Sequence, residues 1–251
     1  MENTKLVSIV MASYNSEEFI GEAIDSILEQ SFSNWELLII DDCSTDNSIE
    51  VIENYSSNDD RIKLFQNSLN SGPAVTRNVG IEAAKGNYLT FLDSDDLWVS
   101  DFLEKSLKFM HDKECHFVFS SYYRWYYGSD KVDDVFEVPE KATYQSLLKT
   151  CPISCLTAVI NIEELGKYYM PEIDKRQDYG LWLRILKDYP YALGIKEPLA
   201  TYRIRPNSVS RNKFKAMYYV WLVYRDLEGM GVIKSFYYLT RYAINGYKKY
   251  K

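Results

Sequence analysis

Four short apolar runs in the first hundred residues constrain the fold of this chain more than any other feature. They read LVSIVMA, WELLIID, RIKLFQN and YLTFLD, and each has the length of a strand. Segments whose apolar residues recur at helical spacing, such as FIGEAIDSIL, lie between them. Strands with little polar alternation are buried on both faces, and the strand–helix–strand order predicts right-handed crossovers. The sequence therefore predicts an α/β fold with a mostly parallel central sheet flanked by helices.

After about residue 100 the pattern is less regular. A short helix capped by Thr143 is expected, and beyond Asn212 we expect two helices separated by Gly229 and Gly231. The chain of 251 residues suffices for one large α/β domain with a helical tail. Four further elements are predicted, a helix at 101–113, an aromatic strand at 116–127, a strand at 156–162 and a helix at 178–189.

Charge and cysteine usage exclude some classes of protein. The net charge is −7, which argues against nucleic acid as a partner. The four cysteines show no disulfide-framework spacing, so we expect free thiols and a reducing compartment. No run approaches the roughly 18 apolar residues that a membrane-spanning helix needs.

Polar residues follow the predicted strands of the first half at the points where the strands end. Ligands of open α/β sheets bind beyond the carboxyl ends of the strands, so these residues are expected to converge on one crevice. They are Ala12, Ser13 and Tyr14 after the first strand, Asp41 and Asp42 after the second, and Asp93, Ser94, Asp95 and Asp96 after the fourth.

The last of these groups holds three carboxylates within four residues. Like charges this close repel, and burying them is costly unless a cation neutralises them. Hard cations such as Mg²⁺ and Mn²⁺ take carboxylate oxygens and share their coordination with substrate phosphates. The crevice is therefore predicted to bind a nucleoside diphosphate and a divalent cation, with the ring of Tyr14 on the base.

Four blocks of the sequence resemble family 2 glycosyltransferases, which have the GT-A fold, a Rossmann-like nucleotide-binding fold. The region up to residue 251 is similar to bacterial surface-polysaccharide glycosyltransferases of the teichuronic-acid type. The resemblance implies a GT-A catalytic domain at residues 1–211, with a nucleotide-binding half at about 1–97 and an acceptor half at about 98–211, and a helical tail at 212–251. The blocks, in family order, are VSIVMASYNSEEFIGEAIDSILEQSF, WELLIIDDCSTDNS, NSGPAVTRNVGIEAAKGNYLTFLDSDD and RQDYGLWLR.

The resemblance also implies roles for particular residues. Asp95 would be the main ligand of a Mn or Mg cation, with Asp93 beside it, and Asp178 would be the catalytic base. Residues 154–157 and 175–177 would select the sugars. The residues implied to bind the nucleotide sugar are Ala12, Tyr14, Asp42, Arg77, Asp93 and Ser94.

Several of these residues also have a purely structural interpretation, which the sequence leaves open. Asp42, implied to accept a hydrogen bond from the base, can equally cap a helix, and Asp178 can be the N-cap of its own helix. Tyr14 can be an aromatic side chain at a strand end. Arg77 can be a surface residue of a helix, paired with a side chain one turn away.

One position departs from the family pattern. Many members carry a histidine in a YR-x-H segment, whereas this chain reads YRIRPNSVS and has Arg205 at that place. Arginine cannot ligate a metal at neutral pH, but it can pair with phosphate through two hydrogen bonds. Arg205 is therefore expected to neutralise the leaving diphosphate, and the structural alternative is a cation on a surface loop. His111 and His116 lie outside the motifs and are expected to be non-catalytic.

The implied reaction is inverting, metal-dependent sugar transfer from a nucleotide diphosphate donor, with UDP favoured, to a hydroxyl of a glycan or polyprenyl-linked glycan. One base and one in-line displacement invert the anomeric centre, whereas retention through a covalent intermediate needs a second, nucleophilic carboxylate. Two other classes stay open, a DxD phosphatase and a non-catalytic nucleotide-sugar or glycan-binding module. Phosphatases of the haloacid dehalogenase type normally have Thr or Val after the second Asp, where this chain has Asp96.

Residues 212–251 form a basic and aromatic tail. Eight basic and two acidic side chains give it a net charge of +6, within a chain whose total is −7. A basic aromatic helix on an acidic body is typical of attachment to an anionic membrane surface. We therefore predict a cytoplasmic protein that is peripheral on the inner face of the cell membrane. The alternative is that the tail packs on the catalytic domain or on another subunit, as in an oligomer.

Overall fold

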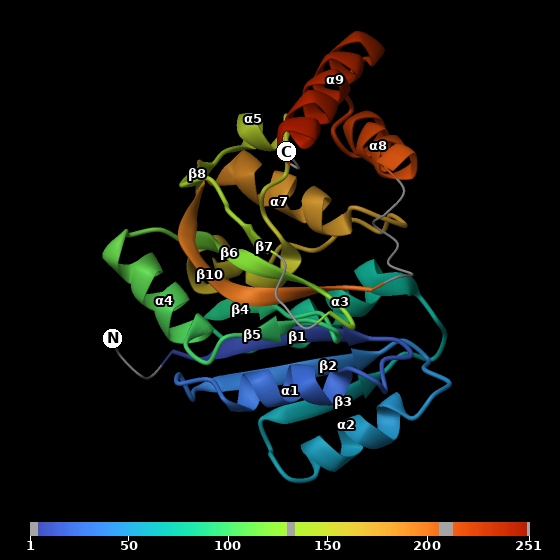
Figure 1. The fold of residues 1–251 in the computed structure, drawn as a ribbon, viewed down its shortest axis with the longest axis vertical. Helices are drawn as coiled ribbons and strands as arrows, with labels where there is room; N and C mark the ends of the chain where they lie inside the picture. Colours follow the sequence, from blue (N-terminus) through green and yellow to red (C-terminus); the bar gives the residue numbers. More distant parts are fainter. Residues whose placement is uncertain (1–4, 130–133, 206–212, 250–251) are drawn as a thin grey trace.

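The structure is a computed structural model that describes residues 5–129, 134–205 and 213–249. Its ten described strands form one sheet in the order β3-β2-β1-β4-β9-β6-β10-β5, with β7 paired to β6 and β8 paired to β10 (Figure 1). The strands are β1 Val7–Ser13, β2 Trp35–Asp41, β3 Ile62–Gln66, β4 Tyr88–Phe91, β5 Leu97–Trp98, β6 Phe117–Tyr126, β7 Asp134–Phe136, β8 Lys141–Ala142, β9 Val159–Asn161 and β10 Ala192–Ile204.

Helices cover both faces of this sheet, so the predicted α/β class is confirmed. A 3₁₀ turn at Cys155–Thr157 precedes β9, and a π-helical turn at Val223–Leu227 extends the eighth helix. The four cysteines are free thiols, as predicted. The helices are α1 Ile20–Leu28, α2 Ser48–Ser56, α3 Gly72–Ala83, α4 Phe102–Asp112, α5 Tyr144–Leu147, α6 Ile162–Leu165, α7 Gln177–Asp188, α8 Lys213–Leu222 and α9 Val232–Lys249.

The first half of the sheet is parallel, as predicted. Strand β1 pairs with β2 from Val7 opposite Trp35 to Ser13 opposite Asp41. Strand β4 lies on the other side of β1, and β3 lies beside β2, both in the parallel sense. The carboxyl ends of β1, β2 and β4 therefore meet at one edge of the sheet, and the polar residues that follow these strands lie close together.

The second half of the sheet is mixed. Strand β9 runs antiparallel to β4 and β6, whereas the 13-residue β10 runs parallel to β6. Strand β10 is not predicted by the sequence pattern, because Lys196, Glu197 and Pro198 interrupt its apolar residues. The register of β10 against β6 shifts on both sides of Pro198. The strand brings Arg203 and Arg205 to the edge where β1, β2 and β4 end.

Two hydrophobic cores, one on each face of the sheet, follow from the alternation along β1 and β2. Ile9, Met11 and Ile39 belong to the core formed with α1, α2 and α4. Val10 and Ile40 belong to the core formed with α3 and α7. Alternate residues of a strand point to opposite faces, so burial on both faces explains why these strands are predominantly apolar.

Helix α3 packs directly against β1 and β2. A Cβ atom at Gly80 would lie 2.5 Å from Val10 Cγ1 and 2.7 Å from Ile40 Cδ1. Glycine suits this position because any side chain would displace core residues. The close packing places the N-terminal turn of α3 next to Asp42, at the end of β2.

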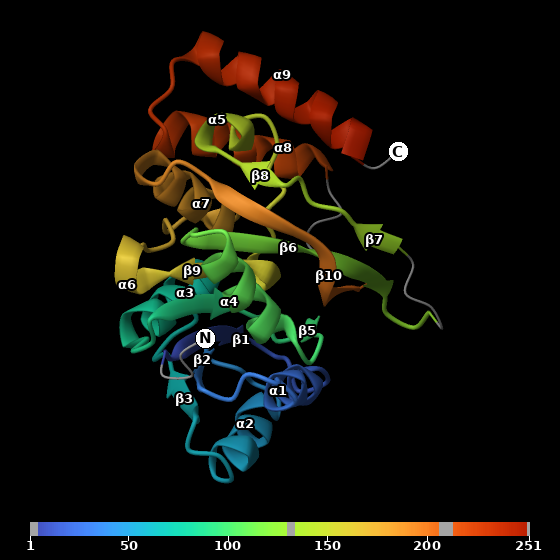
Figure 2. The same ribbon diagram turned by 90° about the vertical axis from the view of Figure 1, so that its left-hand side faces the viewer.

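The tail packs on the rest of the domain. Val223 and Tyr224 are 0% exposed and belong to the core that includes α7. The Tyr224 hydroxyl donates to the carbonyl of Leu148 at 2.7 Å, and Lys187 of α7 pairs with Glu228 at 2.9 Å. Figure 2 shows α8 and α9 beside α5 and α7, at the end of the molecule far from α2. Within the described ranges, no helix has both the length and the apolar character to cross a membrane.

Candidate active site

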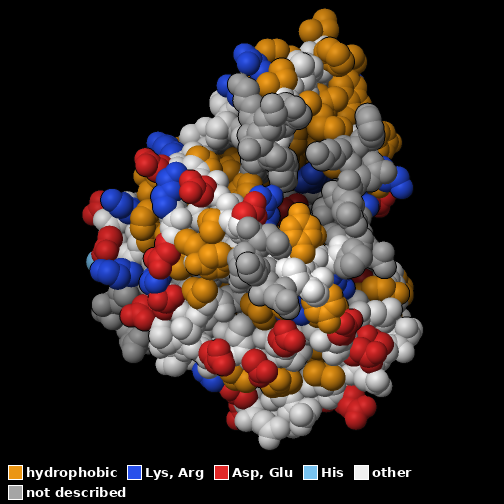
Figure 3. Space-filling model, viewed as in Figure 1, with side chains coloured by type: hydrophobic (Ala, Val, Ile, Leu, Met, Phe, Trp, Pro, Cys, Tyr) orange, Lys and Arg blue, Asp and Glu red, His pale blue; other side chains and the backbone are white. Residues whose placement is uncertain are grey.

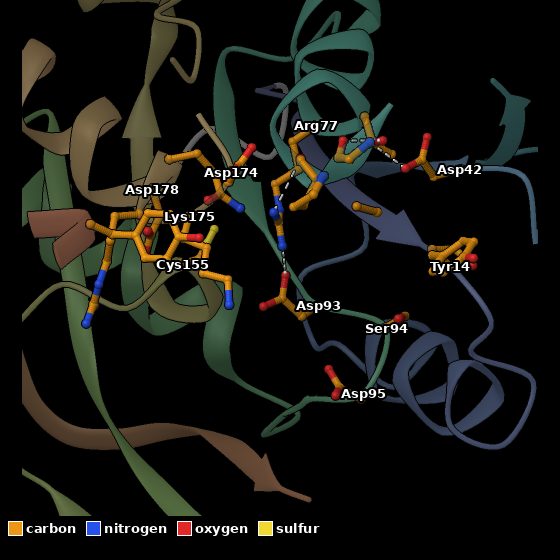
Figure 4. Close-up of a pocket in the computed structure, with 18 of the residues that line it drawn as sticks. Tyr14, Asp42, Arg77, Asp93, Ser94, Asp95, Cys155, Asp174, Lys175 and Asp178 are labelled. Atoms are coloured by element: carbon orange, nitrogen blue, oxygen red, sulfur yellow. Dashed lines mark hydrogen bonds and ion pairs between the residues drawn. The ribbon is translucent and has the colours of Figure 1, made fainter. Parts of the chain in front are cut away.

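A cleft of about 740 Å³ opens at the edge where the parallel strands end. In Figure 3 it is the hollow below the tail, where acidic and basic side chains are visible, and Figure 4 shows its lining. Asp41 and Asp96, which were also expected at the crevice, are buried and do not line it, and of residues 154–157 only Cys155 does. The residues predicted to act in catalysis, nucleotide-sugar binding or metal binding all lie on its wall, although their roles stay predictions. They are Ala12, Tyr14, Asp42, Arg77, Asp93, Ser94, Asp95, Asp178 and Arg205.

The cleft has two distinct ends. Tyr14 and Asp42 lie at one end, which we call the β2 end (Figure 4). Asp178 and Lys175 lie at the other, which we call the α7 end. The Arg77 side chain lies between the two ends. A ligand that spans the cleft would therefore pass this arginine.

The loops after β1 and β2 are held in an uncommon backbone conformation. Asn15 has φ 48° and Cys43 has φ 64°, a left-handed region that few residues other than glycine adopt. The Asn15 side-chain oxygen accepts from the N–H of Thr45 at 2.8 Å, and the Asn15 N–H donates to Ser44 Oγ at 2.9 Å. These bonds tie the two loops together beside Tyr14, which is 52% exposed. An exposed ring at the mouth of a cleft suits stacking on a planar ligand.

Asp42 organises the start of α3. Its Oδ1 accepts from the Asn67 side-chain amide at 2.7 Å and from the Ser71 N–H at 2.9 Å, and its Oδ2 accepts from the Gly72 N–H at 2.8 Å. Burial disfavours the ionised form, but these hydrogen bonds outweigh burial, so the pKa of Asp42 is lowered. Asp42 therefore caps the start of α3, as the structural interpretation of this residue predicted. Asp42 also lines the cleft, so the same carboxylate that caps α3 faces a ligand there.

Arg77 forms an ion pair with Asp93 in the middle of the cleft. The arginine is only 9% exposed, so it is not a surface residue, and its buried Nε has no hydrogen-bond partner among the described residues. Burial disfavours the guanidinium charge, but the Asp93 carboxylate more than compensates, and the pKa of Arg77 is raised. A buried donor without a partner at a cleft wall can serve an anionic ligand.

The other two carboxylates of LDSDD point in different directions. Asp95 Oδ2 pairs with Arg205 Nη2 at 2.7 Å. Asp96 is 1% exposed and accepts from the backbone N–H of Arg203 at 2.8 Å. Burial, and then the charge of Asp93, raise the pKa of Asp95, and burial above all raises the pKa of Asp96 well above its ordinary value. Asp96 is therefore a core residue, and Asp93 and Asp95 are the two that face the cleft.

Arginines thus supply positive charge that the sequence pattern had assigned to a metal. Among the residues that the structure describes, no group of three or more His, Cys, Asp and Glu side chains converges as a metal centre. Asp93 and Asp95 nevertheless fit a hard divalent cation. Such a cation often binds through one or two carboxylates and completes its coordination with waters and phosphate oxygens. The donor set therefore suits a cation that arrives with a nucleotide.

Helix α7 begins at the opposite end of the cleft with a strained backbone. Its N-cap residue is Arg176, which has φ 66°. Asp178 lies in the first turn and is half-buried, so the alternative that it is the N-cap is wrong. Buried Tyr179 and Trp182 hold the helix in place. The Asp178 carboxylate has no hydrogen bond or ion pair within the described part of the chain. The carboxylates of Asp42, Asp93, Asp95 and Asp96 each have at least one.

Some residues of the lining escape prediction from the sequence. Lys215, Ala216 and Tyr219 come from α8 of the tail, to which the sequence analysis assigned no part of the site. Arg203 is 2% exposed at the base of the cleft and pairs with Glu22 at 2.5 Å. No sequence signal marks either feature, because both depend on contacts between elements far apart in the chain.

A mixed α/β domain with a charged cleft at the carboxyl ends of β1, β2 and β4 is the architecture of GT-A glycosyltransferases. The sequence profile of Glycosyl transferase family 2 matches residues 8–164. The chain therefore belongs to glycosyl transferase family 2 and is a glycosyltransferase.

Two relatives are similar over almost their whole length. TuaG of Bacillus subtilis (strain 168), provisionally named as a teichuronic acid biosynthesis glycosyltransferase, is 42% identical over 250 residues, which are 99% of each chain. WfgD of Escherichia coli, named as a UDP-Glc:alpha-D-GlcNAc-diphosphoundecaprenol beta-1,3-glucosyltransferase, is 38% identical over 246 residues, 98% of this chain and 95% of that one. Both relatives are named for sugar transfer in glycan synthesis.

Two solved structures share the fold. S. aureus TarS 1–349 in complex with UDP-GlcNAc matches with a TM-score of 0.69 at 19% identity, over 94% of this chain and 71% of that one. The mannosyltransferase PcManGT from Pyrobaculum calidifontis, in complex with GDP-Man and Mn²⁺, matches with a TM-score of 0.69 at 16% identity, over 93% and 69% of the chains. At these identities the likeness shows the fold alone.

We expect Asp42→Asn to lower the free energy of unfolding by about 1–3 kcal/mol, because the new amide leaves a buried N–H of Ser71 or Gly72 without an acceptor. The lowered folded-state pKa means that the stabilisation is present above the unfolded pKa of about 4 and is lost as the pH falls through the folded value. Urea denaturation should therefore show a large difference from wild type at neutral pH and a smaller one in acid.

The control is Asp60→Asn, because Asp60 is exposed. It should leave stability unchanged at both pH values. Equal stability of Asp42→Asn and wild type at neutral pH would show that the three hydrogen bonds do not hold the start of α3.

Proposed function

We propose that this protein transfers a sugar from a UDP-sugar to a hydroxyl of a lipid-linked glycan, with inversion at the anomeric carbon. One observation carries the proposal. The Asp178 carboxylate, which has no partner in the described ranges, lies in the same cleft as the arginine-paired Asp93 and Asp95. Family membership favours this function over the phosphatase and the binding module.

The donor would bind at the β2 end of the cleft. Tyr14 would stack on the uracil, Asp42 would accept a hydrogen bond from the N3–H of the base, and the buried Arg77 would face the phosphates. Ala12 and Ser94 are small, so they leave room for the nucleotide. The UDP-Glc in the name of WfgD and the UDP-GlcNAc bound to TarS support a UDP-sugar.

A Mn²⁺ or Mg²⁺ ion held by Asp95 and Asp93 would supply positive charge against the departing diphosphate. The Mn²⁺ in the PcManGT complex supports this choice. Arg205, which now pairs with Asp95, would turn to the phosphate oxygens, because a carboxylate that binds a cation no longer needs the guanidinium. The arginine would then take the place of the family's histidine without binding the metal.

Asp178 would accept the proton of the acceptor hydroxyl while that oxygen attacks the anomeric carbon and the bond to UDP breaks. The first turn of a helix favours negative charge, so the position of Asp178 suits a carboxylate. One available base and one displacement imply inversion. Asp174 also lines the cleft but is exposed, so we rank it second as the base.

The acceptor would bind at the α7 end, formed by the acceptor half of the domain at about 98–211 and by α8 of the tail. The nucleotide-binding half at about 1–97 would hold the donor, as the sequence implies. The diphosphoundecaprenol in the name of WfgD favours a polyprenyl-linked glycan acceptor in surface polysaccharide synthesis. We place this reaction at the inner, cytoplasmic face of the cell membrane, where a lipid-linked acceptor and a nucleotide sugar meet.

The outer face of α9 is the part of the tail that suits a membrane surface. Ser235 and Tyr238 pack inward, whereas Lys234 and Arg241 lie seven residues apart beside an exposed apolar row. Figure 3 shows apolar side chains gathered over the tail. Apolar rows flanked by basic residues bind anionic membrane surfaces. We call this row the apolar stripe of α9, and its members are Ile233 (89% exposed), Phe236 (66%), Tyr237 (49%) and Ile244 (45%).

We expect Asp178→Asn to cut sugar transfer by about 10²-fold or more, because the amide cannot accept the proton. The affinity for UDP should stay within a few-fold of wild type, since the substitution is nearly isosteric. UDP release from UDP-Glc, with a GlcNAc-diphospho-lipid as acceptor, measures transfer, and calorimetry measures UDP binding. Asp174→Asn is the matched control and should keep most of the activity. If the two variants behave in the opposite way, the base is Asp174.

Asp95→Ala should abolish the part of UDP binding that depends on Mn²⁺, because Asp95 is the central carboxylate facing the cleft. Calorimetry with UDP, in the presence and absence of Mn²⁺, provides the measurement. Asp60→Ala, outside the cleft, should retain the full metal dependence. A metal-enhanced affinity in Asp95→Ala equal to that of wild type would exclude Asp95 as the main ligand.

Replacing Ile233 and Phe236 together by serine should lower binding to vesicles of anionic lipid about 10-fold or more, because each apolar side chain contributes about 1.5–3 kcal/mol when buried. Co-sedimentation at low salt is the measurement. Leu69→Ser is the control, since Leu69 is 62% exposed but lies outside the tail. If the wild-type protein stays in the supernatant, the apolar stripe serves contact with another subunit. Point substitutions are preferable to deletion of the tail, which would expose the buried Tyr224.

A further inference from the structure

Positive charge is balanced differently at the two ends of the cleft. Arg77, Arg203 and Arg205 each form an ion pair with a carboxylate. At the α7 end, by contrast, the ammonium group of Lys175 has no carboxylate partner within the described ranges and lies 5.5 Å from the centroid of the Tyr219 ring. A half-buried cation that faces a cleft, and that has no carboxylate as an ion-pair partner, favours an anionic ligand.

Two further basic residues line the same end, and they come from separate elements. Arg176 adjoins Lys175 just before α7, and Lys215 lies on α8, one turn before Tyr219. We call Lys175, Arg176 and Lys215 the cationic cluster. The residues are 40 positions apart in the sequence, so the packing of α8 over the start of α7 creates the cluster. Figure 4 shows Lys175 beside Asp178 at this end of the cleft.

Basic residues outnumber acidic ones in the lining of the α7 end. Asp174 and Asp178 are the acidic residues that line the α7 end, and they face three basic side chains. The positive end of the α7 dipole lies at the same place and adds to the attraction for anions. A group with more than one negative charge, such as a diphosphate, matches this arrangement better than a neutral sugar does.

We propose that the cationic cluster, with the ring of Tyr219 above Lys175, binds the phosphate groups of a lipid-linked acceptor. The inference rests on the proposed transferase function and assigns the acceptor's phosphates to named residues. The cluster adjoins Asp178, so phosphate binding would hold the attached sugar next to the base. Helix α8 carries part of the cluster and belongs to the tail, so the lipid chain would leave the cleft beside the tail.

The test is a binding measurement with UDP at saturation, so that the donor site is filled. Three probes are compared by titration: farnesyl diphosphate, farnesol and inorganic pyrophosphate. The variants are Lys175→Ala and Lys215→Ala, with Lys175→Arg as the conservative replacement. Lys113→Ala is the matched control, because Lys113 is exposed at the end of α4 and far from the cleft lining. UDP affinity is measured separately for each protein.

We expect both alanine variants to bind farnesyl diphosphate about 10-fold or more weakly, the usual scale for loss of one charge-assisted hydrogen bond. UDP affinity should not change, Lys175→Arg should keep most of the farnesyl diphosphate affinity, and farnesol should bind weakly to every protein.

Unchanged affinity of the alanine variants for farnesyl diphosphate would overturn the proposal. A loss of UDP affinity in these variants would assign the cluster to the donor instead. Equal binding of pyrophosphate and farnesyl diphosphate would overturn the inference that the ligand is lipid-linked. If the wild-type protein fails to bind UDP, the proposed function itself is contradicted.

Discussion

Three carboxylates within four residues follow a strand whose last three residues are buried, and they impose the electrostatic constraint on which the site depends. Asp93 is neutralised by Arg77 of α3, and Asp95 by Arg205, just beyond β10. Asp96 is removed from the cleft and held by the backbone of β10. The constraint therefore joins the two halves of the domain. The carboxylates of the loop after β4 are neutralised or hydrogen-bonded only when a helix from the first half and a strand from the second half contact this loop.

The sequence predicts the first half of the fold well, because its signals are local. Each strand is a short, predominantly apolar run, and parallel strands bring their ends to one edge, so the convergence of Tyr14, Asp42 and Asp93 is expected from the positions of the strands. Strand β10 is different, because a polar segment around Pro198 breaks its pattern and neighbours in the sheet compensate. The contribution of α8 to the cleft is likewise not predictable from the sequence, since it depends on which face of the tail packs inward.

Structural and functional interpretations of one residue need not exclude each other. Asp42 caps the start of α3 and also lines the cleft, so a ligand would meet a carboxylate that is already oriented. Asp178 shows the opposite arrangement, because Arg176 takes the N-cap position in a strained conformation and leaves the carboxylate without a structural task. Strained backbone of this kind persists only where the surrounding packing enforces it. Here the buried side chains of Tyr179 and Trp182 hold helix α7 in place.

The position of α8 has an evolutionary consequence. One wall of the cleft is built by residues 7–97, and part of the opposite wall is built by a helix that follows all ten strands of the sheet. Changes in α8 can therefore alter that wall without disturbing the strands that position Tyr14, Asp42 and Asp93. Such an arrangement lets the wall formed by α8 vary while the parallel strands are kept, so that the shape of the cleft can change without rebuilding the sheet.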